Sequence, residues 1–179
     1  MCMNSNYSDN RPKVKFTATN GIESNVQFEQ FSILIGRNGS GKSELLNLMN
    51  EKYVHRNSAD DIISFFERKF FNFGKDVNSL FVKCNSLILI DNIEHGLDPS
   101  NIRKVIKELK NLAYDKDCVI IGITYSPVVL NEFKDKEYSI FVFPDSPEKG
   151  ITPLDEFKNP NWMAHFHLGD LYDREELFD

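Results

Sequence analysis

Short runs of consecutive apolar residues recur along the chain, separated by polar stretches. The clearest runs cover residues 31–35, 87–90, 118–123 and 138–143. A strand that is apolar at every position, and not only at alternate ones, is typical of a parallel sheet covered on both faces. Between two runs, apolar residues at helical spacing predict a helix that Asp98 and Pro99 begin: Ile102, Val105, Ile106, Leu109, Leu112 and Ala113. The alternation predicts an α/β fold with a mostly parallel central sheet flanked by helices.

Three other segments give local predictions. Residues 14–18 alternate in polarity and 22–28 follow the turn signal Asn20-Gly21, which predicts an N-terminal antiparallel hairpin. Residues 58–61 resemble a helix start, and the apolar residues up to 71 follow at mostly helical spacing, so we expect a helix there that ends at Phe73-Gly74. A short helix is expected over residues 127–133.

The 179 residues suffice for one domain. We expect a frayed, polar N-terminus over residues 1–12, a compact domain over 13–150, and a C-terminal segment over 151–179. From Asn159 onward this last segment combines aromatic, aliphatic and acidic residues, which is typical of an ordered appendage or a docking segment.

Composition limits the partners. The net charge of −6 argues against broad nonspecific binding of DNA. A local basic face remains open, with an ordinary solvated helix surface as the alternative; its members would be Lys13, Lys15, Arg103, Lys104, Lys107 and Lys110. The three cysteines lack metal or redox spacing, the N-terminus has no apolar core segment, and no apolar run is long enough to span a membrane. These features predict a cytoplasmic protein.

The strongest chemical signal lies between the apolar run 31–35 and the expected helix over residues 42–52. The eight residues there match the phosphate-binding pattern G-x-x-x-x-G-K-[ST]: Gly36, Arg37, Asn38, Gly39, Ser40, Gly41, Lys42 and Ser43. Glycines let successive backbone N–H groups point into one hollow, and the helix adds the positive end of its dipole. We expect Lys42 to reach the β- and γ-phosphates of ATP and the Ser43 hydroxyl to bind Mg²⁺.

A nucleotide site also needs a carboxylate near the metal. Asp91 follows the buried run 87–90, and the end of a neighbouring strand is where such a carboxylate is required. We therefore expect Asp91 to hold the Mg²⁺ shell, with an ordinary turn-forming aspartate as the alternative.

Three blocks together resemble the ABC-type ATPases of the OLD/RecF/SMC branch, a group of P-loop NTPases. They are the phosphate-binding loop, residues 87–99 (LILIDNIEHGLDP) and residues 121–127 (IGITYSP). The resemblance implies an ATP-binding head that often dimerises with ATP sandwiched between subunits. It further implies that Asp91 is the Mg²⁺ carboxylate and that Asp98 lies in the loop that crosses the dimer interface.

Two positions depart from the pattern of this family. Asn92 stands where the family has the glutamate that activates water, and Tyr125 stands where it has a histidine that senses the γ-phosphate. An amide cannot accept a proton as a carboxylate does, and a tyrosine lacks a ring nitrogen that titrates near neutral pH. Glu94 and His95 are the nearby residues that would have to take over the base role, although both lie further along the turn. Glu94 also matches a second acidic position of the family. The candidate catalytic residues are therefore Asn92, Glu94 and Tyr125.

Two further elements of the family are missing from the sequence. No glutamine lies between Ser43 and Asp91, and no segment resembles the serine/glycine motif L-S-G-G-Q that closes over the ATP of the partner. We expect Mg·ATP binding with slow hydrolysis, in a head that acts as a nucleotide switch for a partner subunit or effector. The resemblance leaves a homodimer and DNA contact open, and points to DNA repair or anti-phage defence.

Two alternatives remain. A scaffold that binds ATP without turnover is favoured by Asn92 and Tyr125. A small-molecule kinase would need a substrate lid with arginines, and residues 51–85 carry only Arg56 and Arg68.

Overall fold

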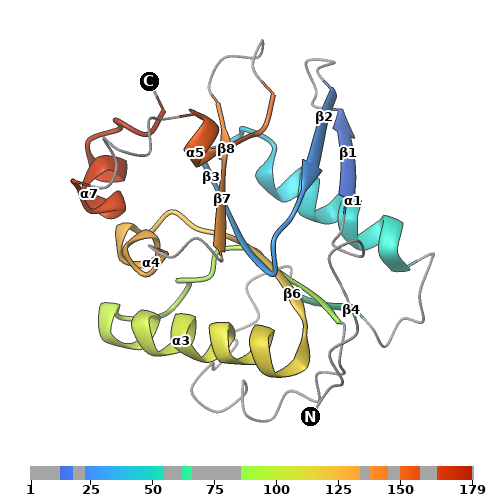
Figure 1. The fold of residues 1–179 in the computed structure, drawn as a ribbon, viewed down its shortest axis with the longest axis horizontal. Helices are drawn as coiled ribbons and strands as arrows, with labels where there is room; N and C mark the ends of the chain where they lie inside the picture. Colours follow the sequence, from blue (N-terminus) through green and yellow to red (C-terminus); the bar gives the residue numbers. More distant parts are fainter. Residues whose placement is uncertain are drawn as a thin grey trace.

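The computed structural model describes residues 13–17, 23–54, 62–65, 86–133, 138–144, 150–157 and 165–178. Within these ranges a six-stranded sheet has the order β4-β5-β6-β3-β7-β8 (Figure 1). Its strands are β3 (Phe31–Gly36), β4 (Ile62–Phe65), β5 (Leu87–Ile90), β6 (Val119–Ile123), β7 (Tyr138–Phe143) and β8 (Thr152–Pro153). All neighbours are parallel except β8, which pairs antiparallel with β7. The predicted α/β fold with a mostly parallel sheet is confirmed.

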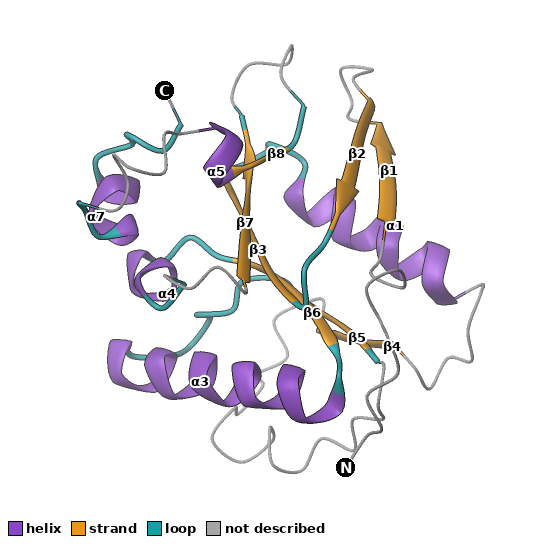
Figure 2. Ribbon diagram, in the orientation of Figure 1, coloured by secondary structure: helices purple, strands orange, loops and turns teal. Residues whose placement is uncertain are grey.

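Helices cover both faces of this sheet, as Figure 2 shows. Along β3, Ile33 and Ile35 pack into one hydrophobic cluster with the apolar stripe of α3 (Pro99–Lys116), while Leu34 packs into the other with α1 (Lys42–Val54). β5, β6 and β7 distribute their side chains between the two clusters in the same alternating way. Because both faces are apolar, the strands appear in the sequence as continuous apolar runs.

The N-terminal hairpin is also present. β1 (Lys13–Thr17) pairs antiparallel with β2 (Glu23–Gln27), as predicted, although the turn signal itself lies outside the described residues. Val26 of β2 and Phe28, which follows the strand, enter the cluster on the α1 side of the sheet. There the Phe28 ring meets Phe141 edge to face at 5.1 Å. The hairpin is thus joined to the main core.

The helix predicted to begin at residues 58–61 is wrong at residues 62–65. These residues form β4, which pairs parallel with β5 in the register Ile62↔Leu87 to Phe65↔Ile90. The rest of the predicted helix, up to Gly74, lies outside the described residues. Three apolar residues among four positions fit a strand as well as a helical turn. Here the segment forms a strand because it pairs with the neighbouring edge of β5.

The C-terminal residues pack on the same core. α4 (Pro127–Asn131) follows β6, α5 (Leu154–Phe157) follows β8, and α7 (Leu168–Asp173) packs beside α4 (Figure 1). The apolar side chains that join the cluster on the α3 side are Leu154, Leu171 and Leu177. Docking of residues 151–179 to a partner stays a prediction, and so does the domain boundary at residue 150. No helix in the described part of the chain is long and apolar enough to cross a membrane.

Candidate nucleotide-binding site

The carboxyl ends of three neighbouring strands bring the candidate residues to one edge of the sheet. In the ladders, Leu34 of β3 pairs with Ile123 of β6, and Ile90 of β5 pairs with Gly122. The residues that follow these strands are the phosphate-binding loop after β3, Asp91 after β5 and Thr124 after β6. Since the strands are parallel, these three segments leave the sheet on the same side.

The loop after β3 has the backbone expected of a phosphate-binding hollow. Gly36, Gly39 and Gly41 adopt φ angles of 148°, 80° and 96°, which are unfavourable for residues with a Cβ. At Gly36 a Cβ would also lie 2.7 Å from the carbonyl oxygen of Phe143, so β7 leaves no room for a side chain there. The loop runs directly into α1, whose first hydrogen bond joins the Leu45 nitrogen to the Gly41 oxygen at 2.9 Å.

Lys42 is folded back against its own loop. Its Nζ donates to the carbonyl oxygens of Gly36 and Arg37, both at 2.7 Å, and to Ser40 Oγ at 3.1 Å. The side chain is only 3% exposed, so the ammonium group is held at the base of the loop by backbone oxygens. A buried ammonium needs such compensation, and phosphate oxygens are chemically equivalent replacements for these carbonyl acceptors.

The turn after β5 is anchored to β6. The Ile93 nitrogen donates to the Ile123 oxygen at 3.0 Å, and the Ile93 side chain is fully buried. A Cβ on Gly122 would collide with Ile93 Cδ1 and lie 2.9 Å from Cγ1. The absence of a side chain at Gly122 therefore leaves room for Ile93, which holds the turn that follows Asp91 against β6.

Asn92 has a strained backbone and an unsatisfied side chain. Its φ is 59°, in the left-handed region, where Asn is tolerated better than most residues. Among the residues that the structure describes, its buried Oδ1 has no hydrogen-bond partner. A buried acceptor left unpaired is unfavourable. Asn92 directly follows Asp91 in the chain, which places this unpaired acceptor at the same edge of the sheet.

Glu94 joins the turn after β5 to the segment after β6. One carboxylate oxygen accepts from Thr124 Oγ1 at 2.7 Å, and the other accepts from the backbone nitrogen of Tyr125 at 2.7 Å. Thr124 is fully buried, and its hydroxyl oxygen also accepts from the Ser126 nitrogen at 3.0 Å. Both oxygens of Glu94 thus hold the segment that carries Tyr125.

Tyr125 lies near Lys42 and near the carboxylates of Asp91 and Glu94. Its ring centroid lies 4.7 Å from Lys42 Nζ, within the range of a cation–π contact. Partial burial raises the pKa of Tyr125 above its ordinary value of 10, and the charges of Asp91 and Glu94 raise it further. The phenol is therefore neutral at physiological pH and can serve as a hydrogen-bond donor.

Asp98 caps a helix. Its Oδ1 accepts from the backbone nitrogens of Ser100 and Asn101 at 2.9 and 3.0 Å and from the Ser100 hydroxyl at 2.7 Å. Its Oδ2 accepts from the Asn101 side-chain amide at 2.6 Å. These bonds, led by that from the Ser100 hydroxyl, lower the pKa of the exposed Asp98 carboxyl below 3.8. The predicted cap is confirmed; the role at a dimer interface stays a prediction.

The C-terminal segment reaches the same edge of the sheet, which the sequence did not reveal. Arg37 of the phosphate-binding loop forms an ion pair with Glu175, with 3.0 Å between Nη2 and Oε2. Burial raises the pKa of the Tyr172 phenol to about 12, with smaller contributions from the charges of Glu94, Tyr125 and Asp173. A local sequence pattern cannot predict a contact between two residues that are 138 positions apart in the chain.

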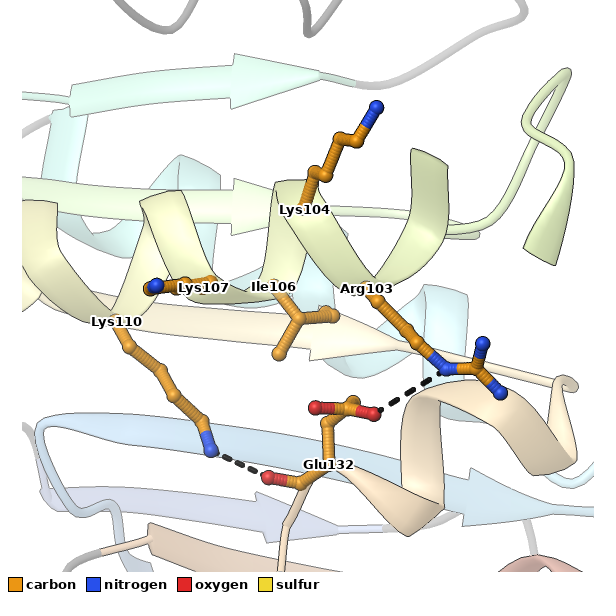
Figure 3. A pocket seen from close by; sticks show the side chains of 6 residues that line it. All are labelled: Arg103, Lys104, Ile106, Lys107, Lys110 and Glu132. Carbon is orange, nitrogen blue, oxygen red and sulfur yellow. Dashed lines mark hydrogen bonds and ion pairs between the residues drawn. The ribbon is translucent and has the colours of Figure 1, made fainter. Parts of the chain in front are cut away.

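A separate concave surface lies on α3, away from this edge. A pocket of about 320 Å³ there is lined by six residues, whose side chains Figure 3 shows: Arg103, Lys104, Ile106, Lys107, Lys110 and Glu132. Glu132 pairs with Arg103 at 3.7 Å, and its backbone oxygen accepts from Lys110 Nζ. Four basic residues of α3 thus lie together around this pocket, whereas Figure 1 shows β1, which carries Lys13 and Lys15, well apart from it. DNA contact stays open.

No family model matches the sequence, and no curated protein matches it. Solved structures do match. The ATP-binding subunit of an ABC transporter is 14% identical, with 92% of this chain and 98% of that chain covered and a TM-score of 0.57. cbiO1 from Clostridium perfringens, part of the ABC transporter complex cbiONQ, is 16% identical over 73% of this chain and 83% of that chain, with a TM-score of 0.50. The chain therefore has the fold of ABC transporter ATP-binding subunits.

Proposed function

We propose that this chain binds Mg·ATP in the loop from Gly36 to Ser43 and acts as a nucleotide switch for a partner protein. The observation that carries the proposal is the buried ammonium of Lys42, held by carbonyl oxygens within a loop of positive-φ glycines at the start of α1. Such a cation is prepared to exchange backbone acceptors for phosphate oxygens. The fold shared with ATP-binding subunits of ABC transporters supports the same proposal.

The residues at this edge also fit a magnesium ion. Mg²⁺ prefers oxygen ligands and keeps several of its waters. The Ser43 hydroxyl and the partly exposed Asp91 carboxylate offer oxygens, and the unpaired Asn92 Oδ1 offers an acceptor for a water. When bound, the ion would neutralise phosphate charge. Asp91 would orient it, and Asn92 would orient a water without taking its proton.

We further propose that hydrolysis is slow. General-base catalysis typically contributes about 10²–10⁴-fold in rate, and Asn92 supplies no base. Glu94 is a poor substitute because both of its oxygens already accept hydrogen bonds. The catalytic roles we propose are water positioning by Asn92, loop positioning by Glu94 and sensing of the γ-phosphate by Tyr125.

The membership of the OLD/RecF/SMC branch, the role in DNA repair or anti-phage defence and the partner subunit rest on the three sequence blocks. A scaffold that binds ATP without turnover is the second candidate, and the uncharged Asn92 side chain favours it.

Calorimetric titration with Mg·ATP tests binding. We expect the wild-type chain to bind and Lys42→Ala to lose binding, whereas Lys104→Ala, which removes an exposed lysine of α3, serves as the matched control. Equal affinities in all three proteins would overturn the proposal. Single-turnover hydrolysis then separates the candidates: a slow rate that Lys42→Ala abolishes supports the ATPase, and tight binding without turnover supports the scaffold.

A further inference from the structure

The ion pair between Arg37 and Glu175 connects the phosphate-binding loop to the C-terminal segment. Arg37 and Lys42 are the two cationic residues of that loop. Lys42 Nζ binds the backbone oxygen of Arg37, while Glu175 binds its guanidinium. Both cations of the loop therefore make contacts within the chain that phosphate oxygens would compete for.

The backbone around Glu175 is held in place by the packing of neighbouring residues. On its N-terminal side Leu171 is buried in the main core, and on its C-terminal side Leu177 is buried there too. Glu175 itself has a φ of 61°, and its nitrogen donates to the Tyr172 oxygen at 2.9 Å, so it occupies a tight turn. The turn is closed by the Tyr172 and Phe178 rings, which meet edge to face at 5.3 Å. The carboxylate is thus presented to Arg37 by an ordered segment.

The segment is also tied to the structure that follows β6. The Gly169 nitrogen donates to Asn131 Oδ1 at 2.8 Å, and a side chain at Gly169 would collide with the backbone of Pro127. α4 begins at Pro127, two residues after Tyr125. The same short segment therefore contacts the phosphate-binding loop directly and the helix next to Tyr125.

We propose that Glu175 is a positioning residue that lowers nucleotide affinity by holding the Arg37 guanidinium, so that the C-terminal segment and the nucleotide phosphates compete for Arg37. This inference rests on the proposed ATP site at Lys42. A carboxylate near the loop repels the negative phosphates, and it also engages a cation that would otherwise attract them. By linkage, nucleotide binding weakens the contact of the segment with the loop by the same factor.

The pair contributes little to folding, because the side chains of Arg37 and Glu175 are 54% and 67% exposed. Variants at these two positions should therefore fold normally, and a change in their affinity reports on the site. Glu176→Gln is a matched control: it removes the same charge from the adjacent residue, which pairs with Arg174 at 3.9 Å.

The test is a double-mutant cycle on Mg·ATP affinity, measured by calorimetry at low and at physiological salt. We expect Glu175→Gln to bind Mg·ATP about three- to fivefold more tightly than wild type, with a larger gain at low salt. In an Arg37→Gln background, Glu175→Gln should increase the affinity for Mg·ATP clearly less, because the chain then has no Arg37 guanidinium for the substitution to free. Glu176→Gln should stay within about twofold of wild type. Hydrogen exchange of the amides from 168 to 178 should speed up when Mg·ATP is added.

The outcomes separate the two proposals. Binding that depends on Lys42 but is equal in wild type and Glu175→Gln overturns the role of Glu175 alone. An equal gain with and without Arg37, or in Glu176→Gln, shows a general charge effect and overturns it as well. Absence of Lys42-dependent binding in every variant overturns the nucleotide site and, with it, this inference.

Discussion

The carboxylate of Glu94 accepts a hydrogen bond of 2.7 Å from the backbone nitrogen of Tyr125, across the ends of β5 and β6. Its second oxygen accepts from the hydroxyl of the buried Thr124. Through these two hydrogen bonds Glu94 links the turn after β5 to the segment after β6, and we call this link the Glu94 brace. It holds the backbone of Tyr125, whose ring centroid lies 4.7 Å from Lys42 Nζ.

Removal of this brace should destabilise the fold. Glu94→Ala leaves the Tyr125 nitrogen and the Thr124 hydroxyl without their acceptor, and an unsatisfied buried group costs about 1–3 kcal/mol. Urea unfolding should show that loss in the free energy of unfolding, whereas Glu51→Ala on the exposed face of α1 should change it by less than about 0.5 kcal/mol. Unchanged stability with lost hydrolysis would instead identify Glu94 as a catalytic base.

Restoration of a carboxylate at residue 92 should accelerate hydrolysis. We expect Asn92→Glu to hydrolyse Mg·ATP about 10²-fold faster than Asn92→Gln, because only the former offers a proton acceptor. The two variants match in side-chain length and share the strain of a φ near 59°, so their ratio isolates the charge. Single-turnover rates give that ratio, and a value near one would mean that residue 92 does not face the attacking water.

The contact between Gly122 and Ile93 can be tested by a compensating pair. Gly122→Ala should cost about 1–3 kcal/mol, because its new methyl group meets the Ile93 side chain. Ile93→Val removes the Cδ1 atom at the point of collision. We expect the double variant to be more stable than the sum of the single changes predicts, as measured by urea unfolding. Strict additivity would place the collision elsewhere.

The Tyr172 phenol should make stability depend on pH in the alkaline range. Its pKa is raised from 10.0 to about 12 in the folded chain, so above pH 10 the unfolded state releases this proton first. The free energy of unfolding should therefore fall between pH 10 and about 12. After discounting for the half-buried position of the ring, the fall is about 1 kcal/mol. Tyr172→Phe should show a shallower decline than wild type; identical slopes would contradict the assignment.

Much of the fold follows from local patterns in the sequence. The continuous apolar runs predicted β3, β5, β6 and β7, and Asp98 with Pro99 predicted the start of α3, because burial on two faces and helix capping are encoded within a few residues. β4 was missed because Ile62–Phe65 has no local feature that excludes a helix. Its identity as a strand depends on a partner more than twenty positions later in the chain.

In the candidate site, too, the sequence predicted some features and missed others. The loop from Gly36 to Ser43 and the acidic residue after β5 were recognisable, since their spacing is fixed by local geometry. The brace formed by Glu94, the pair between Arg37 and Glu175 and the proximity of Tyr172 were not, since each joins segments that only the sheet topology brings together.

The sequence pattern of the loop does not distinguish residues that packing requires from residues that nucleotide binding requires. The close approach of Gly36 to Phe143 makes this distinction. Packing against β7 requires Gly36 whether or not a nucleotide binds, whereas a Cβ on Gly39 would meet no atom within 4 Å. A lineage that abandoned nucleotide binding could therefore lose Lys42 before Gly36, whereas Gly39 would stay restricted by its φ of 80° for as long as the loop keeps this backbone. A glycine at the end of β3 therefore indicates only that the strands pack as they do here. The lysine is the residue that indicates nucleotide binding.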